Sequence, residues 1–176
     1  MASLRIIRRR IRSTQNTKQL MRAMQLVSAS KLKRAQGRLL QARLVLEFLD
    51  GLLQRVLAAA PRREHALCRR HEGAPSLLVI FTSDTGLCGS YNTNLIQLAE
   101  SHFRRDTARR TKVIYIGKKG YRYFTRRGYA SEEAFIDLAG RPDPAKAQAI
   151  GSSLMERFLS AQLSSIELLY SEFRSS

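Results

Sequence analysis

Residues 32–57, LKRAQGRLLQARLVLEFLDGLLQRVL, repeat apolar side chains at alternating steps of three and four positions. Positions spaced in this way lie along one side of an α-helix, and such a stripe is typical of a helix that packs against another helix. We expect the stripe to form a coiled-coil seam. Burying each of its large members would contribute about 1.5–3 kcal/mol. These seam residues are Leu32, Leu39, Leu46, Leu49, Leu53 and Val56.

The same rhythm extends back to Leu4, so residues 1–60 are predicted to form one long helix. The stripe is polar from Thr14 to Ser28, apart from Met21, and we expect it to be wetter there. At 1.5 Å of rise per residue the helix would span roughly 80 Å. Pro61 is the first proline and marks the predicted end.

Positive charge is concentrated in this helix. The first 46 residues contain twelve Lys or Arg and no Asp or Glu. Residues 1–63 account for +13 of the formal net charge of +17, and residues 64–176 account for the remaining +4. Such a surface suits an acidic partner, whether nucleic acid or protein. No stretch approaches the ~20 consecutive apolar residues of a membrane span.

The rest of the chain alternates strand and helix patterns. After a polar linker at 61–76, apolar runs predict strands within 76–84, 111–117, 134–136 and 164–173. Helices are predicted over about 93–105, over 118–128 with Gly128 closing the helix, and over 144–160 with Asp143 as its cap. This order predicts a small doubly wound α/β domain at 77–176, with a mostly parallel sheet covered on both faces.

The linker holds a group of metal-ligand residue types. His65, Cys68 and His71 are spaced three apart, but no fourth ligand is visible, which favours a solvated loop over a zinc site. Cys68 and Cys88 are the only cysteines. A disulfide between them is possible by count, but nothing indicates export, and Cys88 is better read as a small buried thiol.

Residues 82–92, TSDTGLCGSYN, join a strand to a helix through two glycines, a geometry that can present backbone N–H groups to phosphate. The motif is neither G-x-G-x-x-G nor a Walker loop, and GKKG at 117–120 is better read as a tight turn. Asp84 follows a strand and is more often a loop cap than a functional group. His102 has no nucleophile partner in the sequence, so we expect no catalytic site, no metal and no cofactor.

Leu32, Leu39, Leu46 and Leu53 recur every seven residues behind a basic segment, as in a basic leucine zipper. The flanking e and g positions carry no complementary charges to specify a parallel dimer. No aromatic residue precedes Phe48, so stacking on single strands is not supported either. Nucleic-acid binding stays the alternative hypothesis.

Four stretches together are specific. They are MASLRIIRRRIRSTQNTKQLMRAMQLVSASKLKRAQ at 1–36, SDTGLCGSYNTNL at 83–95, VIYIGKKGYRYF at 113–124 and FLSAQLSSIELLYSEF at 158–173. In order and spacing they resemble the gamma subunit of F-type ATP synthases. The resemblance implies a central-stalk rotor of a proton-translocating enzyme, peripheral on the cytoplasmic face of an energy-transducing membrane. The long helix would stand in the bore of an alpha–beta hexamer, which carries the nucleotide chemistry. The α/β domain would meet the epsilon subunit and the membrane c-ring.

The resemblance also implies contact residues. The turn at Arg22–Met24 and the basic cluster Lys31, Lys33 and Arg34 are expected to contact beta subunits. Gly86, Cys88 and Gly89 are expected to contact the lower rim of the hexamer. In the family a second long helix follows the domain and pairs with the first, whereas this sequence stops at Ser176. We therefore expect a truncated product or fragment, or a partner helix supplied by another polypeptide.

Overall fold

The computed structural model describes residues 4–59, 65–69, 71–106, 110–138 and 143–174. The chain divides into two compact units, Met1–Pro61 and Arg62–Ser176. The first is a long helix, and the second is a parallel α/β domain. The predicted fold class is therefore confirmed.

Helix α1 runs without a break from Leu4 to Ala59 and contains no buried residue. Gly37 and Gly51 lie within it and do not interrupt it, although each costs roughly 1 kcal/mol of helix propensity. The polar stretch is helical too, and there the Thr17 hydroxyl donates to the Ser13 carbonyl oxygen over 3.0 Å. The prediction of one long helix is confirmed.

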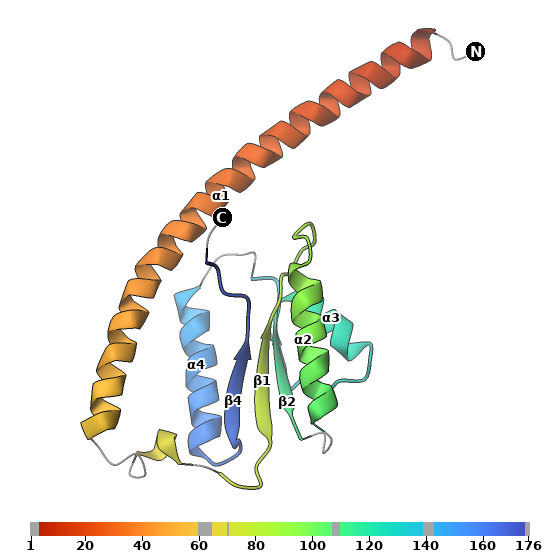
Figure 1. The fold of residues 1–176 in the computed structure, drawn as a ribbon. Coiled ribbons are helices and arrows are strands. Elements are labelled where there is room, and N and C mark those ends of the chain that lie inside the picture. Colours follow the sequence, from red (N-terminus) through yellow and green to blue (C-terminus); the bar gives the residue numbers. More distant parts are fainter. Residues whose placement is uncertain (1–3, 60–64, 70, 107–109, 139–142, 175–176) are drawn as a thin grey trace. The chain divides into compact units, whose positions relative to one another are not determined.

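The sheet of the second unit has four strands: β1 (Ser76–Phe81), β2 (Lys112–Ile116), β3 (Glu133–Phe135) and β4 (Ser165–Leu169). Their order is β3-β2-β1-β4, and all three pairings are parallel. The chain moves outward from β1 to β3 and then returns to place β4 on the other side of β1, which makes the domain doubly wound (Figure 1).

Three helices cover the two faces of this sheet: α2 (Tyr91–Arg105), α3 (Lys118–Thr125) and α4 (Pro144–Leu159). Alternate residues of β1 point to opposite faces. Leu78 and Ile80 join a core with Ala99 of α2 and Phe124 of α3. Leu77 and Val79 point the other way and join a second core, against which Leu154 and Phe158 of α4 pack. Figure 1 shows α4 on one side of the sheet and α2 and α3 on the other.

Several element boundaries differ from the prediction. Helix α2 begins at Tyr91, two residues early, and a 3₁₀ turn (η1, Ala66–Cys68) lies in the predicted linker, of which residues 61–64 and 70 are outside the described set. Helix α3 ends at Thr125, and Gly128 follows with a φ of 81°. Strand β4 ends at Leu169 rather than near residue 173. Its neighbour β1 ends at Phe81, and Leu169 pairs with Ile80, so there is almost no further strand to pair with.

Candidate functional site

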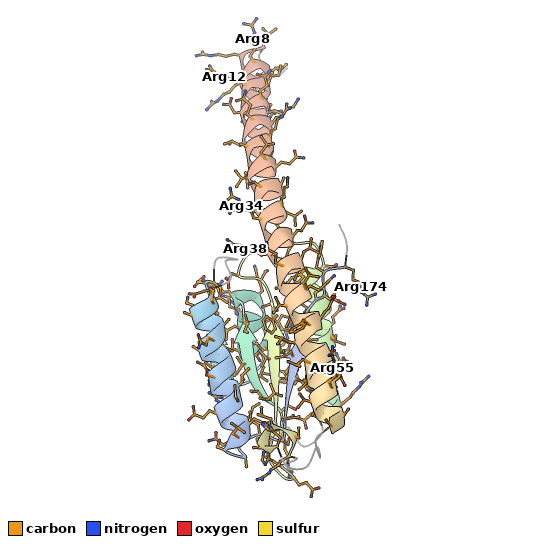
Figure 2. The ribbon with its side chains drawn as sticks, turned by 90° about the vertical axis from the view of Figure 1, so that its left-hand side faces the viewer. Arg8, Arg12, Arg34, Arg38, Arg55 and Arg174 are labelled. Carbon is orange, nitrogen blue, oxygen red and sulfur yellow. The ribbon has the colours of Figure 1, made fainter. Side chains whose placement is uncertain are left out.

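The basic surface of α1 lacks acidic neighbours along most of its length. No Asp or Glu precedes Glu47, so a Lys or Arg before residue 43 has no acidic side chain three or four positions ahead. Figure 2 shows Arg8, Arg12, Arg34, Arg38 and Arg55 standing out from the helix. This cationic surface is therefore available to a partner that supplies negative charge.

The five expected contact residues of α1 do not share one face. Arg22 and Lys33 are eleven positions apart, about three helical turns, so they lie on the same side. Met24 and Lys31 are seven apart and lie on another side, close to the apolar stripe, while Arg34 faces away from it. Met24 is 58% exposed. A partner that touched all five would have to surround the helix.

The seam is exposed over its whole length. Its six residues range from 38% exposed at Leu39 to 64% exposed at Leu46. By comparison, apolar side chains of similar size in the core of the α/β domain are completely covered: Leu77 and Ile80 are both 0% exposed. The stripe is thus an apolar surface without cover in this unit, which is the usual mark of an interaction site.

The loop between β1 and α2 is held rigidly at its base. The carboxylate of Asp84 accepts hydrogen bonds from the backbone N–H groups of Lys118 and Asp137, each 3.0 Å long. These two bonds tie the end of β1 to the start of α3 and the end of β3. The loop-cap interpretation of Asp84 is confirmed, because its carboxylate oxygen is used in these two structural hydrogen bonds.

The turn at Gly117–Gly120 packs directly on the end of β1. The Thr82 hydroxyl accepts from the Gly120 N–H over 2.9 Å. Gly117 has a φ of 103°, and a Cβ there would lie 2.0 Å from the Thr82 carbonyl oxygen. Gly117 is therefore explained by close packing against the backbone of Thr82, and Gly120 by close packing against the Thr82 side chain. The tight-turn interpretation of this motif is confirmed.

A second brace holds the loop itself. The side-chain amide of Asn92 donates to the Ser83 hydroxyl over 2.8 Å and to the Cys88 sulfur over 3.1 Å, and its oxygen accepts from the Ser83 N–H over 2.9 Å. Cys88 is half-buried, and burial, helped by the nearby thiol, raises the pKa of Tyr91 above its ordinary value. Cys88 therefore acts as a packing and acceptor group.

The tip of this loop presents a residue that the sequence reasoning missed. Leu87 is fully exposed, at 103%, and adopts a φ of 62°. A left-handed conformation is unfavourable for a residue with a side chain, and an exposed leucine is not stabilised by burial. The sequence feature that could have identified it is a large apolar residue in a loop between Gly86 and Gly89. Its full exposure and backbone conformation are evident only in the fold.

The three possible metal ligands of the linker, His65, Cys68 and His71, do not come together, and the two histidines have structural roles instead. The His65 ring nitrogen accepts from the Leu67 N–H over 3.2 Å and caps η1, while the His71 ring lies edge-on to Phe158 at 5.1 Å. Cys68 is exposed, and both Cys68 and Cys88 are free thiols. In the part of the chain that the structure describes, no three His, Cys, Asp or Glu side chains gather closely enough to hold a metal ion.

His102 lies on α2, 3.8 Å from the carboxylate of Glu167 on β4, in a partly exposed pair. Among the described residues, no Ser hydroxyl or Cys thiol forms a hydrogen bond with its ring. Every helix within the described ranges, α1 included, is too short or too polar to serve as a membrane span.

Comparisons with known proteins agree over almost the whole chain. A family model described as ATP synthase matches residues 3–176. The ATP synthase gamma chain of Moorella thermoacetica is 34% identical, covering 99% of this chain and 62% of the relative. That of Solibacter usitatus is 40% identical, covering 99% and 63%. The chloroplastic gamma chain of Trieres chinensis is 38% identical, covering 95% and 46%. The chain thus spans about three-fifths or less of the length of these relatives.

Proposed function

Since the chain belongs to the ATP synthase gamma chain family, we propose that it acts as a central-stalk rotor subunit of a proton-translocating F-type ATP synthase. In this role it couples rotation of the membrane ring to conformational change in the alpha–beta hexamer. The observation that carries the proposal is α1, a helix of 56 residues with no buried residue and an N-terminal region free of acidic side chains.

A helix of this kind suits mechanical coupling. Its backbone hydrogen bonds run along the axis, so it transmits force without changing length. Its charge is asymmetric along the axis, and its apolar stripe occupies one side only. As such a shaft turns inside a ring of similar subunits, each subunit meets a different side in sequence. Differential contact with each side can then favour a different conformation of that subunit.

The expected contact residues fit this geometry. Arg22, Met24, Lys31, Lys33 and Arg34 are distributed around α1, and a surrounding hexamer is a partner that could reach all of them. Acidic loops of beta subunits would supply the complementary charge. We assign these five side chains to the beta interface.

We assign the braced loop at Gly86–Gly89 to a contact with the lower rim of the hexamer, and we add Leu87 to it. The Asp84 and Asn92 bonds hold the loop before any partner arrives, so binding would cost little ordering entropy. A fully exposed leucine on a rigid loop can insert into an apolar pocket of a partner.

The α/β domain would meet the epsilon subunit and the c-ring, which places the protein at the cytoplasmic face of an energy-transducing membrane. The subunit would carry no catalytic site of its own, because the hexamer carries the nucleotide chemistry. A second rotor helix would cover the seam in the assembled motor.

The test is retention of the chain by an alpha–beta hexamer assembled without a gamma subunit. We expect the wild-type chain to be retained and to show no ATP hydrolysis alone. Arg22→Glu should weaken retention about tenfold, because it places a negative charge against acidic loops. Arg55→Glu on the same helix, outside the assigned contacts, is the matched control. Equal retention of both variants, or none for the wild type, would refute the proposed interface.

A parallel measurement addresses the loop. Leu87→Asn places a residue that tolerates positive φ at the same position, so the fold should be kept while the apolar contact is lost. We expect weaker retention with an unchanged melting temperature. The nucleic-acid alternative predicts instead a DNA affinity that falls steeply with added salt, with hexamer retention absent.

A further inference from the structure

The α/β domain contains a pocket of about 600 Å³ at the edge of the sheet where β2 begins. It forms where the end of α2, the start of β2 and the segment leading into β3 come together (Figure 1). Because β1 and β2 are parallel, the loop at 82–92 lies at the other edge. Pockets for small molecules commonly have volumes of roughly 300–1,000 Å³. The lining of this one includes Phe103, Arg104, Asp106, Arg127, Tyr129 and Glu132.

The two arginines of this lining are held in place by one small network. Arg104 lies 3.5 Å from the carboxylate of Glu100, and the Tyr123 hydroxyl donates to the same carboxylate over 2.7 Å. The Arg127 guanidinium lies over the Tyr123 ring at 3.6 Å and donates to the Tyr123 carbonyl oxygen over 3.3 Å. Each guanidinium has five N–H donors, so one carboxylate and one carbonyl oxygen leave both of them with donors for a ligand.

A phosphate monoester is the anion that such a pair suits best. Its charge near pH 7 is about −1.5 to −2, which two guanidinium groups together balance. Arginine also donates two parallel N–H groups to phosphate oxygens, a geometry that lysine does not offer. Because the network holds Arg104 and Arg127 before a ligand arrives, binding would cost little side-chain entropy.

The two carboxylates of the lining require a different group on the ligand. Hydrogen bonds from the side chain and backbone of Thr111 lower the pKa of Asp106, which is therefore ionised at neutral pH. Glu132 pairs with Lys112 over 3.1 Å. A carboxylate has about four acceptor sites, so both groups can accept further hydrogen bonds. They would repel a bare anion but would hold an anion that also carries hydroxyl groups.

An aromatic surface completes the pocket. The Tyr129 ring stacks on Phe103 with centroids 4.7 Å apart at 26°, and it meets the edge of Phe124 at 5.6 Å. Tyr129 is nevertheless 36% exposed. A ring that is fixed by two aromatic neighbours and is still partly open can pack against a sugar or stack on a flat base.

We propose that this pocket binds a phosphorylated sugar. Arg104 and Arg127 would hold the phosphate, Asp106 and Glu132 would accept from the sugar hydroxyls, and Tyr129 would pack on the ring. The chemistry recognised is a phosphate monoester close to vicinal hydroxyl groups. Free sugar phosphates and nucleoside monophosphates both carry it, and they differ in whether a base is present to stack on Tyr129.

The first test is calorimetric titration of the full chain with ribose 5-phosphate, AMP and inorganic phosphate at constant ionic strength. We expect saturable binding of ribose 5-phosphate or AMP with a Kd of about 1 mM or lower, and binding of inorganic phosphate at least about tenfold weaker. AMP bound more tightly than ribose 5-phosphate would identify a nucleoside phosphate as the ligand. Ribose 5-phosphate bound as tightly or more tightly would identify a free sugar phosphate. If neither binds more tightly than inorganic phosphate, the proposal is overturned.

The second test locates the binding. Arg104→Gln and Arg127→Gln should each raise the Kd of the tighter ligand at least about tenfold, because each removes a charge-assisted hydrogen bond to phosphate. Arg105→Gln and Arg126→Gln are the matched controls, since they make the same charge change at neighbouring exposed positions outside the lining. We expect them to leave the Kd within about twofold of the wild type.

The controls also separate a pocket from general attraction to a chain with a net charge of +17. General attraction would weaken equally in all four variants, and that result would overturn the proposal. The Arg104 side chain is 78% exposed, so its replacement should leave the melting temperature unchanged. Arg104→Lys keeps the charge but loses the two-pronged donor, and its Kd should lie between those of the wild type and Arg104→Gln.

This inference does not rest on the proposed function, and the two can fail separately. The hexamer test addresses Arg22 on α1 and Leu87, which lies at the opposite edge of the sheet from the pocket. Hexamer retention without sugar-phosphate binding would leave the rotor role intact and remove this inference. Binding that depends on Arg104 and Arg127 in a chain that no hexamer retains would do the reverse.

Discussion

Single residues at the end of β1 hold three elements together. Asp84 ties β1 to α3 and to the end of β3, and Thr82 packs against two glycines at the start of α3. Around them lies the loop that we assign to a partner. The precision of that surface therefore depends on residues that never touch the partner.

Gly117→Ala should be severely destabilising. Its φ of 103° is strained for alanine, and the new Cβ would lie 2.0 Å from the Thr82 carbonyl oxygen, so backbone must shift. Strain and overpacking together predict a loss of at least about 3 kcal/mol in the free energy of unfolding.

The control is Gly73→Ala, which has a φ of 85° but no atom within 4 Å of its Cβ. Only the strain applies there, so the loss should be about 1 kcal/mol. Urea unfolding of the two variants checks this, and equal losses would contradict the packing argument.

Asp106 should make the domain sensitive to acid. Hydrogen bonds from the side chain and the backbone N–H of Thr111, the latter 2.7 Å long, lower the pKa of Asp106 below its ordinary value. A carboxyl group with a lowered native pKa stabilises the fold above its unfolded pKa, and this contribution disappears as pH falls through the native pKa. The wild type should therefore lose more stability between pH 7 and pH 3 than Asp106→Asn, measured by urea unfolding at both values. Parallel losses would show that Asp106 contributes nothing.

At the scale of elements, helix α4 is held by its capped N-terminus as well as by the face that packs on the sheet. Helix α4 contains no buried residue, yet Leu154 and Phe158 pack partly buried against the second core. Its N-terminus is capped by Asp143, whose carboxylate accepts from the backbone N–H groups of Ala145 and Lys146. The predicted cap is confirmed.

Asp143→Ala should lower the free energy of unfolding by about 1 kcal/mol, because the first turn of α4 loses its acceptor. Asp143→Ser keeps an acceptor at the same position and should retain most of the stability. Thermal melts of the two variants, followed by circular dichroism, measure the difference. A serine variant as unstable as the alanine variant would exclude capping as the cause.

At the scale of the whole molecule, the two units differ in how they are stabilised. Both core clusters of the domain are built from residues between Leu77 and Leu169. Helix α1 has no buried residue and carries most of the net charge. One unit thus has its own core, while the other presents its apolar side chains to a partner.

Residues 62–176 alone should therefore keep a cooperative thermal transition within a few degrees of the full chain, since a two-state domain is stabilised by its own core. Near-ultraviolet circular dichroism of both proteins checks this, because the aromatic cluster around Phe124 and Tyr115 lies in the domain. Loss of that signal in the shorter protein would mean that α1 contributes to the core.

Much of this architecture was predictable because it depends on local periodicity. A stripe at three- and four-residue steps predicts α1, and β-branched apolar runs predict the strands. The cap at Asp143 and the alternation that makes the sheet parallel are also local signals. Residues 22–34 and 86–89 came from a family resemblance, and their contacts stay predictions.

Other features depend on the tertiary structure and cannot be read from local sequence patterns. The end of β4 follows from where β1 ends, and the roles of Gly117 and Asp84 follow from segments more than thirty residues away. Leu87 became a candidate only when its exposure and positive φ were known. The physical reason is that helix and strand propensities act between near neighbours, whereas strand length, close backbone contact and exposure depend on what the folded chain places alongside.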